Sequence, residues 1–380
     1  PLDVSALERS VQALIERHET LRTVFSQETA QPLQVVLPAG PFALEIHQLS
    51  AELANDADAS IQSFVQTQSQ KTFDLQHGPL LRAALLQVSP NDHVLVLTLH
   101  HIVSDGWSLQ VMIEELVQLY AGFNLGHDAG LPALPIQYAD YAVWQRQWMA
   151  AGERERQLAY WTAQLGSEQP LLELPTDHPR PAQQSFAGAR LPVSIEPALA
   201  AELKALARRE NVTLFMLLLA SFQALLHRYS GQADIRVGVP IANRNRLETE
   251  RLIGFFVNTQ VLRAEFDGSM SGAQLLQQVR QTAMAAQMHQ DLPFEQLVDA
   301  LQVQRNLSHS PLFQAMFNHR SEVESNMAAA LPGLELDTLS WEHRSAQFDL
   351  TLDTSDNPQG LHASLTYATD LFEAATVERM

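Results

Sequence analysis

Cysteine and long apolar runs are both missing from the 380-residue sequence. Without cysteine, the chain has no disulfide bond, no thiolate metal site and no cysteine nucleophile. No stretch is apolar over the length that a membrane-spanning helix needs, and the first residues do not resemble a signal peptide. We therefore expect a cytoplasmic protein with no membrane partner.

Basic residues are also scarce. The chain has 24 Lys and Arg against 43 Asp and Glu, which gives a formal net charge of -19. This balance argues against nucleic acid as a partner, because an acidic surface repels the phosphate backbone. Hydrophobic residues make up 46% of the chain, which is ample for packed lobes. The length suggests about two or three domains.

The most informative stretch is residues 99–108, with the sequence LHHIVSDGWS. It follows a hairpin predicted over residues 80–99, and we expect the second strand of this hairpin to be buried on both faces. Downstream, Ser108 can cap a helix whose apolar residues recur with helical spacing. Because adjacent strand residues point to opposite faces, His100 and His101 are expected to have different roles.

This stretch contains groups suited to acid–base chemistry. An imidazole there can act as a general base, since an unperturbed histidine titrates close to neutral pH. Asp105 can orient the ring or fix the turn, and Gly106 allows a positive φ or the close approach of another backbone. The structural alternative is a buried strand end with two satisfied histidines, but the Asp-Gly pair at this spacing favours a functional site.

The pattern His-His-x-x-x-Asp-Gly, followed by Trp107 and Ser108, resembles the active-site motif of nonribosomal peptide synthetase condensation domains. Five further stretches resemble core motifs of this family and occur in the family's order: residues 17–25 (RHETLRTVF), 138–144 (YADYAVW), 253–259 (IGFFVNT), 289–298 (HQDLPFEQLV) and 308–314 (SHSPLFQ). Together the motifs span most of the chain. The family's first motif would precede Pro1, so we expect the sequence to be a fragment of a longer protein.

The fold class follows first from patterning. Strand and helix signals alternate on both sides of a proline-rich linker at residues 174–181, which predicts an α/β protein of two lobes. We place the N-terminal lobe at residues 1–173 and the C-terminal lobe at residues 174–380, with a truncated last helix. The resemblance implies two chloramphenicol-acetyltransferase-like lobes arranged as a V. It places the active site at their junction, in a tunnel open at both ends.

The resemblance also implies a reaction, in which an amine on one carrier protein attacks a thioester on another and forms an amide bond. The implied partners are an upstream donor and a downstream acceptor peptidyl carrier protein, together with an adjacent adenylation domain. No cofactor is expected to bind directly, because the phosphopantetheine arms of the carriers hold the substrates. A metal site at His100, His101 and Asp105 is a poor alternative, since adjacent strand residues point apart and a third clear ligand is not evident.

The resemblance carries roles over to individual residues. Within the catalytic motif of His100, His101, Asp105 and Gly106, we assign the chemistry to His101, as a base or as the group that positions the amine. His100 is assigned a mainly structural role. Asp105 is expected to pair with an arginine from the other lobe, and Arg244 is the first candidate. Structural support or contact with the substrate is expected from Arg17, Arg22, Trp107 and Asn258. For Asn258 two options stay open, a tunnel lining and a strand-end asparagine satisfied by the backbone.

The subtype rests on three departures between related domains. His100 argues against heterocyclisation domains, which carry aspartate there, and Trp107 before Ser108 argues against epimerisation domains. Residues 308–313 with residues 317–319 (FNH) look like domains that accept a D-configured donor, including dual epimerising and condensing ones. Two alternatives stay open: a coenzyme A-dependent acyltransferase of the same fold, and a non-catalytic docking platform, whose His-His motif is usually degraded.

Overall fold

The computed structural model describes residues 2–27, 32–49, 57–127, 129–303, 306–321, 331, 333–339 and 345–380. The chain forms two compact units. The first unit comprises Pro1–Gln147, Arg244–Phe256 and Ser325–Trp341. The second unit comprises Trp148–Asn243, Val257–Glu324 and Glu342–Met380.

The first unit is built on a small sheet. Its strands lie in the order β3 (Glu45–Gln48), β4 (Leu81–Ser89) and β5 (Asp92–Leu99). β4 and β5 form the antiparallel hairpin that the sequence predicts, and β3 runs parallel to β4. β4 is largely buried, whereas β5 is mostly half-buried. The expectation that β5 is buried on both faces is therefore wrong, because β5 forms an edge of this sheet.

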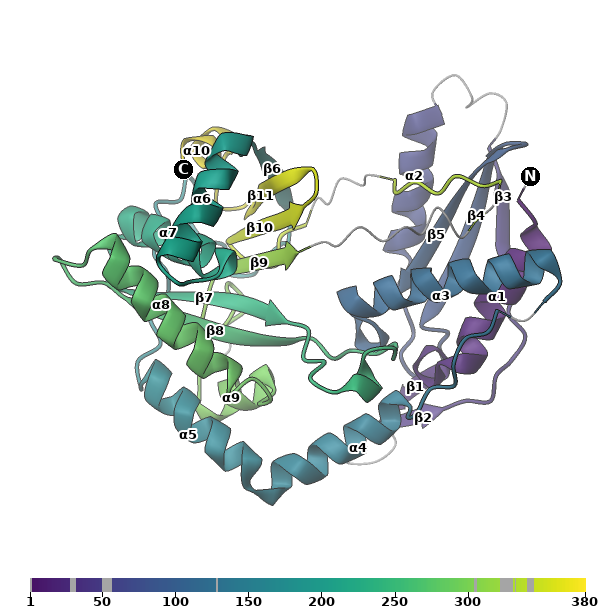
Figure 1. Cartoon of the computed structure of the whole chain (residues 1–380), viewed down its shortest axis with the longest axis horizontal. Coiled ribbons are helices and arrows are strands. Elements are labelled where there is room, and N and C mark those ends of the chain that lie inside the picture. The colour runs from purple at the N-terminus through teal and green to yellow at the C-terminus, as the bar shows by residue number, and fades with distance from the viewer. Residues whose placement is uncertain are drawn as a thin grey trace. The chain divides into compact units, whose positions relative to one another are not determined.

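Helices α1 (Val4–Arg17) and α3 (Gly106–Leu125) pack against each other beside this sheet (Figure 1). The apolar face of α1 is buried in a core shared with α3 and β4. α3 ends at Gly126, whose φ of 76° is a left-handed conformation that glycine adopts without strain. The unit also contains α2 (Ala57–Gln70), most of α4 (Tyr138–Trp148), the ribbon of β1 (Thr23–Ser26) and β2 (Leu33–Val36), and the 3-10 helices η1 (Glu19–Arg22), η3 (His101–Val103) and η5 (Leu247–Thr249).

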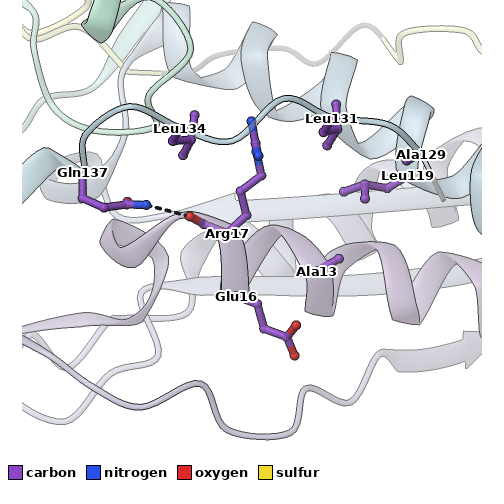
Figure 2. Close-up of a pocket in the computed structure, with 8 residues that line it drawn as sticks. All are labelled: Ala13, Glu16, Arg17, Leu119, Ala129, Leu131, Leu134 and Gln137. Carbon is purple, nitrogen blue, oxygen red and sulfur yellow. Dashed lines mark hydrogen bonds between the residues drawn. The ribbon is translucent and has the colours of Figure 1, made fainter.

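A shallow hollow of about 450 Å³ opens beside α1 (Figure 2). Residues of α1, of the end of α3 and of the segment 129–137 line it. Gln137 spans one side, because its Nε2 donates a hydrogen bond of 3.0 Å to the carbonyl of Arg17. Neither His100 nor His101 lines this hollow, so it is not the site that the sequence predicts.

The second unit is built on a six-stranded sheet with the strand order β6-β11-β10-β9-β7-β8. Its strands are β6 (Gly188–Val193), β7 (Asp234–Ile241), β8 (Asn258–Glu265), β9 (Ala315–Ser321), β10 (Leu350–Asn357) and β11 (Gly360–Ala368). β9 runs parallel to both β7 and β10, and the other neighbours are antiparallel. The last two strands form the hairpin predicted around residues 357–360.

The helices of the second unit surround this sheet. They are α5 (Arg154–Leu165), preceded by the π-helical turn η4 (Met149–Glu153), and α6 (Pro197–Arg209), α7 (Leu214–Ser230), α8 (Gly272–Gln287), α9 (Phe294–Ala300) and α10 (Ala374–Arg379). α7 packs against α8 and against strands of the sheet (Figure 1). Its apolar residues lie in the core, as its very apolar sequence predicts.

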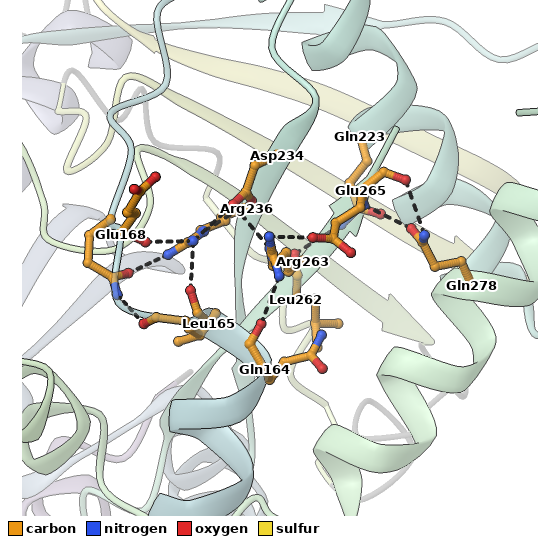
Figure 3. A network of polar contacts seen from close by, with 12 residues as sticks. Gln164, Leu165, Glu168, Gln223, Asp234, Arg236, Leu262, Arg263, Glu265 and Gln278 are labelled. Atoms are coloured by element: carbon orange, nitrogen blue, oxygen red, sulfur yellow. Dashed lines mark hydrogen bonds and ion pairs between the residues drawn. The ribbon is translucent and has the colours of Figure 1, made fainter. Parts of the chain in front are cut away.

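A polar network ties the end of α5 to two strands of the sheet (Figure 3). Arg236 of β7 donates a hydrogen bond of 2.9 Å from Nη2 to the carbonyl of Leu165. Arg263 of β8 donates one of 3.1 Å to the carbonyl of Gln164. The Asp234 carboxylate pairs with both guanidinium groups, at 2.9 and 3.1 Å. Burial alone would raise the pKa of Asp234, but the hydrogen bonds from both arginines hold it below its usual value.

The lobe boundary differs from the one placed between residues 1–173 and 174–380. Residues 148–173 lie in the second unit, where α5 buries Trp161 in the core. The proline-rich linker therefore does not separate the units. The physical reason is that the buried face of α5 needs the core of the six-stranded sheet as its partner.

Residues 244–256, called the return segment below, make a second difference. They connect β7 to β8 along the chain, yet they belong to the first unit. Ile253 is buried in the core with α1 and α3, and Leu252 and Phe256 are buried in a cluster with Tyr141. Apolar burial thus holds this short segment in the first unit.

Candidate active site

His100 and His101 directly follow the last residue of β5. Nδ1 of His100 accepts a hydrogen bond of 3.0 Å from the backbone N–H of Ile102, which caps the turn η3. The ring of His100 also contacts Phe73 in a T-shaped arrangement, with 5.8 Å between the ring centroids. These contacts fit the structural role expected for His100.

His101 has a different environment. Its side chain is exposed, and within the described part of the chain its ring makes no hydrogen bond. The ring contacts Phe255 of the return segment, with centroids 5.0 Å apart and planes inclined by 69°. Both ring nitrogens of His101 are therefore available to a substrate.

Asp105 is a buried connector between three parts of the first unit. Its Oδ1 accepts a hydrogen bond of 2.8 Å from the N–H of Ser108, and its Oδ2 accepts one of 2.9 Å from the N–H of Phe256. Asp105 is therefore the N-cap of α3, which begins at Gly106, so the prediction that Ser108 caps this helix is wrong. Of the two roles considered for Asp105, these contacts correspond to fixing the turn.

Arg244 forms the predicted ion pair with Asp105, with 3.2 Å between Nη2 and Oδ1. Both side chains are buried. Arg244 lies in the same compact unit as Asp105, so the expectation that it comes from the other lobe is wrong. Its Nη1 donates to the carbonyls of Thr249 and Leu252, at 2.5 and 2.8 Å, so Arg244 also shapes the return segment. Burial lowers the pKa of Arg244 and Asp105 opposes this, which keeps the pair ionised.

The return segment is fixed at three consecutive residues. The hydroxyl of Ser108 donates to the carbonyl of Gly254 at 2.8 Å and accepts from its N–H at 3.0 Å. The hydroxyl of Tyr138 donates to the carbonyl of Phe255 at 2.8 Å. Asp105 binds the N–H of the next residue, as described above. Position 254 has to be glycine, because a Cβ there would overlap the ring of Tyr138.

Aromatic packing brings the stretches 138–144 and 253–259 together. The ring of Phe256 contacts those of Tyr138 and Tyr141, with centroids 5.0 and 4.9 Å apart. The guanidinium of Arg244 lies 4.1 Å from the centroid of the same ring. Burial raises the pKa of Tyr138, so its hydroxyl keeps the proton that it donates.

Gly106 and Trp107 complete the loop. Gly106 is the first residue of α3, does not have a positive φ, and has open space where a Cβ would stand. Neither reason that the sequence offered for this glycine, positive φ or close backbone approach, is therefore observed. Trp107 is exposed, and its Nε1 donates a hydrogen bond of 2.9 Å to the carbonyl of Glu250 in the return segment.

Glu115 is a buried carboxylate that the sequence reasoning missed. It pairs with Arg17 at 3.0 Å, with His18 at 2.7 Å and with Arg251 of the return segment at 3.4 Å. Burial alone would raise the pKa of Glu115, but these partners hold it below its usual value. Burial lowers the pKa of His18, so a neutral ring donates its Nε2–H to the carboxylate. The helical phase of Glu115, four residues after a buried valine of α3, could have revealed it.

Arg22 and Asn258 have structural contacts away from the His-His loop. Nη1 of Arg22 donates a hydrogen bond of 2.6 Å to the carbonyl of Leu37, just after β2. Asn258 lies in the second unit, where its Nδ2 donates to two backbone carbonyls, at 3.0 and 2.7 Å. Its Oδ1 accepts a hydrogen bond of 3.0 Å from the N–H of Phe294. Of the two options for Asn258, the structure has the one satisfied by the backbone.

Two further groups of features bear on what the chain binds. Among the residues that the structure describes, no group of three or more His, Asp and Glu is placed to hold a metal ion. No single described helix has both the length and the apolar character to cross a membrane. The pair α6 and α7 passes this test jointly, with a bend of 103° between the two helices.

Known proteins resemble the chain over its full length. The family model of the condensation domain matches residues 1–380. A protein of the linear gramicidin synthase of Brevibacillus parabrevis is 48% identical over 379 residues, which cover 100% of this chain and 5% of that protein. A protein of the plipastatin synthase of Bacillus subtilis (strain 168) is 42% identical over 381 residues, 100% of this chain and 10% of that protein. The chain thus spans a small part of these relatives.

Solved structures resemble the fold. The X-domain from teicoplanin biosynthesis superposes with a TM-score of 0.90 and 26% identity, over 99% of this chain and 84% of that one. The condensation domain of the Monacolin K polyketide synthase MokA gives a TM-score of 0.83 and 22% identity, over 100% and 88%. The predicted α/β fold with chloramphenicol-acetyltransferase-like lobes is therefore confirmed. The match to the family model and the identity to the two synthases show that the chain belongs to the condensation domain family.

Proposed function

We propose that this chain forms a peptide bond within a nonribosomal peptide synthetase. The donor is a peptidyl or aminoacyl thioester on one carrier protein, and the acceptor is an aminoacyl group on another. Membership of the condensation domain family and the identity to two peptide synthases support this assignment. The observation that carries it is the exposed, unbonded ring of His101, which stands beside a loop fixed by the buried pair of Asp105 and Arg244.

The proposed reaction needs little help from proton removal. A free α-amino group has a pKa near 8, so part of the acceptor is neutral at neutral pH. Its nitrogen attacks the thioester carbonyl carbon, the C–N bond forms, and the C–S bond breaks as the tetrahedral intermediate collapses. The proton that leaves the nitrogen ends on the departing phosphopantetheine thiol. Holding the two reactants together can supply about 7–11 kcal/mol of the barrier.

His101 is the residue proposed to act on the amine. Its ring nitrogens can accept a hydrogen bond from the attacking amine, which positions it, or can take its proton as the intermediate forms. Asp105 has its carboxylate oxygens bound to Ser108, Phe256 and Arg244. We therefore assign Asp105 to holding the loop and His101 to the chemistry.

Donor stereochemistry is part of the proposal. The resemblance of residues 308–313 and 317–319 to domains that accept a D-configured donor supports a D-ending peptidyl thioester as substrate. The proposed partners are an upstream and a downstream peptidyl carrier protein and an adjacent adenylation domain. The substrates are carried on phosphopantetheine arms, and no directly bound cofactor is proposed.

A docking platform is the second candidate. One of the solved structures that the chain resembles is a complex of the X-domain and OxyB from teicoplanin biosynthesis, with a TM-score of 0.88 and 26% identity. That protein therefore binds another protein in its structure. The exposed His101 within an intact His-His motif favours the condensing function for this chain.

The test follows amide formation with the chain in its natural polypeptide. One carrier bears an L- or a D-ending peptidyl phosphopantetheine thioester, the other bears an aminoacyl acceptor, and intact-protein mass spectrometry detects the product. His101→Ala is compared with His362→Ala, which removes an exposed histidine of β11 in the second unit.

The outcomes separate the candidates. Product from the D donor, lost in His101→Ala and kept in His362→Ala, supports the proposal. D-configured product from the L donor points to a dual epimerising and condensing domain. Product from an acyl-coenzyme A donor in place of the carrier supports the coenzyme A-dependent alternative. No product from any donor, with wild type and variants alike, favours the docking platform.

A further inference from the structure

The orientation of the His101 ring is not set by a polar partner. Catalytic histidines are commonly oriented by a hydrogen bond from one ring nitrogen to a carboxylate or carbonyl. Within the described residues the ring of His101 has no such bond. Its ring contact is the T-shaped one with Phe255, at 5.0 Å between centroids.

Phe255 is held at its backbone rather than by burial of its side chain. Its carbonyl accepts the hydrogen bond from Tyr138, and both neighbouring residues are bonded to Ser108 and Asp105. The side chain is 38% exposed, whereas that of Phe256 is 3% exposed. The two adjacent phenylalanines are thus used differently: Phe256 packs in the aromatic cluster, and Phe255 presents its ring to His101.

We propose that Phe255 is a positioning residue, whose ring orients the imidazole of His101 toward the reacting amine. The proposal rests on the proposed function. T-shaped contact between aromatic rings is favourable beyond the area that it buries, and here it restricts the rotamers of an otherwise exposed side chain. Aligning a catalytic group in this way acts on the reacting geometry rather than on the binding of the carrier.

This position explains why three consecutive residues of the return segment are fixed. A ring that orients another ring has to be stationary itself, and an exposed phenylalanine on a loop is not held by its own packing. The hydrogen bonds from Ser108, Tyr138 and Asp105 supply that constraint through the backbone. Ser108 and Asp105 lie at the start of the helix that follows His101, so both rings share one support.

The test compares Phe255→Ala, which removes the ring, with Phe255→Tyr, which keeps it. Both are assayed in the natural polypeptide with the carrier-bound donor and acceptor. We expect Phe255→Ala to lower kcat about tenfold while KM for the acceptor carrier stays within about twofold. Phe255→Tyr is expected to keep kcat near the wild-type value. Phe186→Ala, which truncates an exposed phenylalanine of the second unit, is the control and should leave kcat unchanged.

A second readout does not depend on turnover. Diethyl pyrocarbonate acylates neutral imidazole, and peptide mass spectrometry gives the rate at His101 alone. Removal of the ring beside it should raise this rate in Phe255→Ala and leave it unchanged in Phe255→Tyr. Thermal unfolding checks the fold, and Phe256→Ala serves as the variant expected to lower the midpoint.

Each result has a defined meaning. Wild-type kcat in Phe255→Ala, with His101→Ala inactive, would overturn the inference and leave the proposed function standing. Loss of kcat in Phe255→Ala with an unchanged acylation rate or a lowered unfolding midpoint would also overturn it, since it would show a structural role. Full activity of His101→Ala would instead remove the proposed function, and the acylation rates would still decide whether Phe255 holds the ring.

Discussion

The hydroxyl of Ser108 is hydrogen-bonded to both backbone groups of Gly254, donating to its carbonyl at 2.8 Å and accepting from its N–H at 3.0 Å. The same oxygen accepts a hydrogen bond of 2.7 Å from Nη2 of Arg244. A single buried side chain on α3 therefore replaces a paired strand as the backbone partner of the return segment. Because the chain between Ser108 and Gly254 is long, this contact is tertiary and has to be held by the fold.

The Ser108→Ala variant should lose stability. It leaves the N–H and carbonyl of Gly254 and one nitrogen of Arg244 without their partner in a buried place, which costs about 1–3 kcal/mol in the free energy of unfolding. Urea denaturation followed by tryptophan fluorescence measures it. Ser69→Ala, at an exposed position of α2, is the matched control and should change stability by less than about 0.5 kcal/mol. Equal values for the two variants would contradict the prediction.

The Gly106→Ala variant should separate stability from activity. Gly106 has an ordinary helical start and open space around a built Cβ, so alanine should keep or raise stability, by up to about 1 kcal/mol. Because Gly106 directly follows Asp105 at the exposed end of α3, a methyl group there takes up space that the substrate would use. We expect unchanged denaturation midpoints and a lower kcat/KM. A destabilised variant would show that the glycine has a structural purpose instead.

The Asp105 and Arg244 pair should behave as a buried ion pair. Asp105→Ala and Arg244→Met each leave a buried charge without its partner, which costs about 3–5 kcal/mol in the free energy of unfolding. The double variant should cost less than the sum of the two, because the second change removes the group that the first one stranded. A control cycle on the exposed pair of Lys71 and Glu45 should show smaller coupling. Additive effects at the buried pair would contradict the ion pair.

Stability of the first unit should fall on acidification in two steps. The pKa of His18 is lowered in the folded state, so the unfolded chain takes up the proton first, and stability is lost as the pH falls below the usual value of 6.5 toward the folded pKa. The pKa of Glu115 is also lowered, so a second loss sets in below its usual value of 4.5. Arg17 and Arg251 stay charged throughout and oppose protonation of both groups.

His18→Gln tests the first of these steps. Glutamine keeps a donor for Glu115 but does not titrate, so the fall in stability that begins near pH 6.5 should disappear while the one below pH 4.5 stays. Denaturation at a series of pH values gives both curves. An unchanged slope between pH 6.5 and about 5 in the variant would show that another group is responsible.

Local patterns predicted much of what surrounds the loop. The hairpin of β4 and β5, the helix after it and the apolar face of α1 all follow from residue periodicity, because each is decided within one element. The pair of Asp105 and Arg244 was found from the resemblance to a family, and its geometry agrees. The different use of His100 and His101 was also anticipated, since neighbouring strand residues face opposite sides.

What the sequence could not predict depends on contacts between distant segments. The return segment is too short and too apolar to signal that it leaves one unit for the other, so Arg244 was assigned to the wrong lobe. Glu115 was overlooked because a glutamate within a helix normally faces solvent, and its three cationic partners are far apart in the chain. For Asn258 the polarity was visible, but the carbonyls that satisfy it belong to a segment some thirty residues later, by the sequence separations of 32 and 34.

The path of the return segment has a consequence for synthesis on the ribosome. β5, the His-His loop and α3 are translated early, but the glycine, the two phenylalanines and the arginine that fix this loop follow only after β7 has been made. Until Phe256 has left the exit tunnel, the cap of α3 lacks one of its partners and Arg244 is missing from the core. A nascent chain stalled before the return segment should therefore expose the buried carboxylates of Asp105 and Glu115. The first unit has to wait for sequence encoded well downstream before its fold is complete.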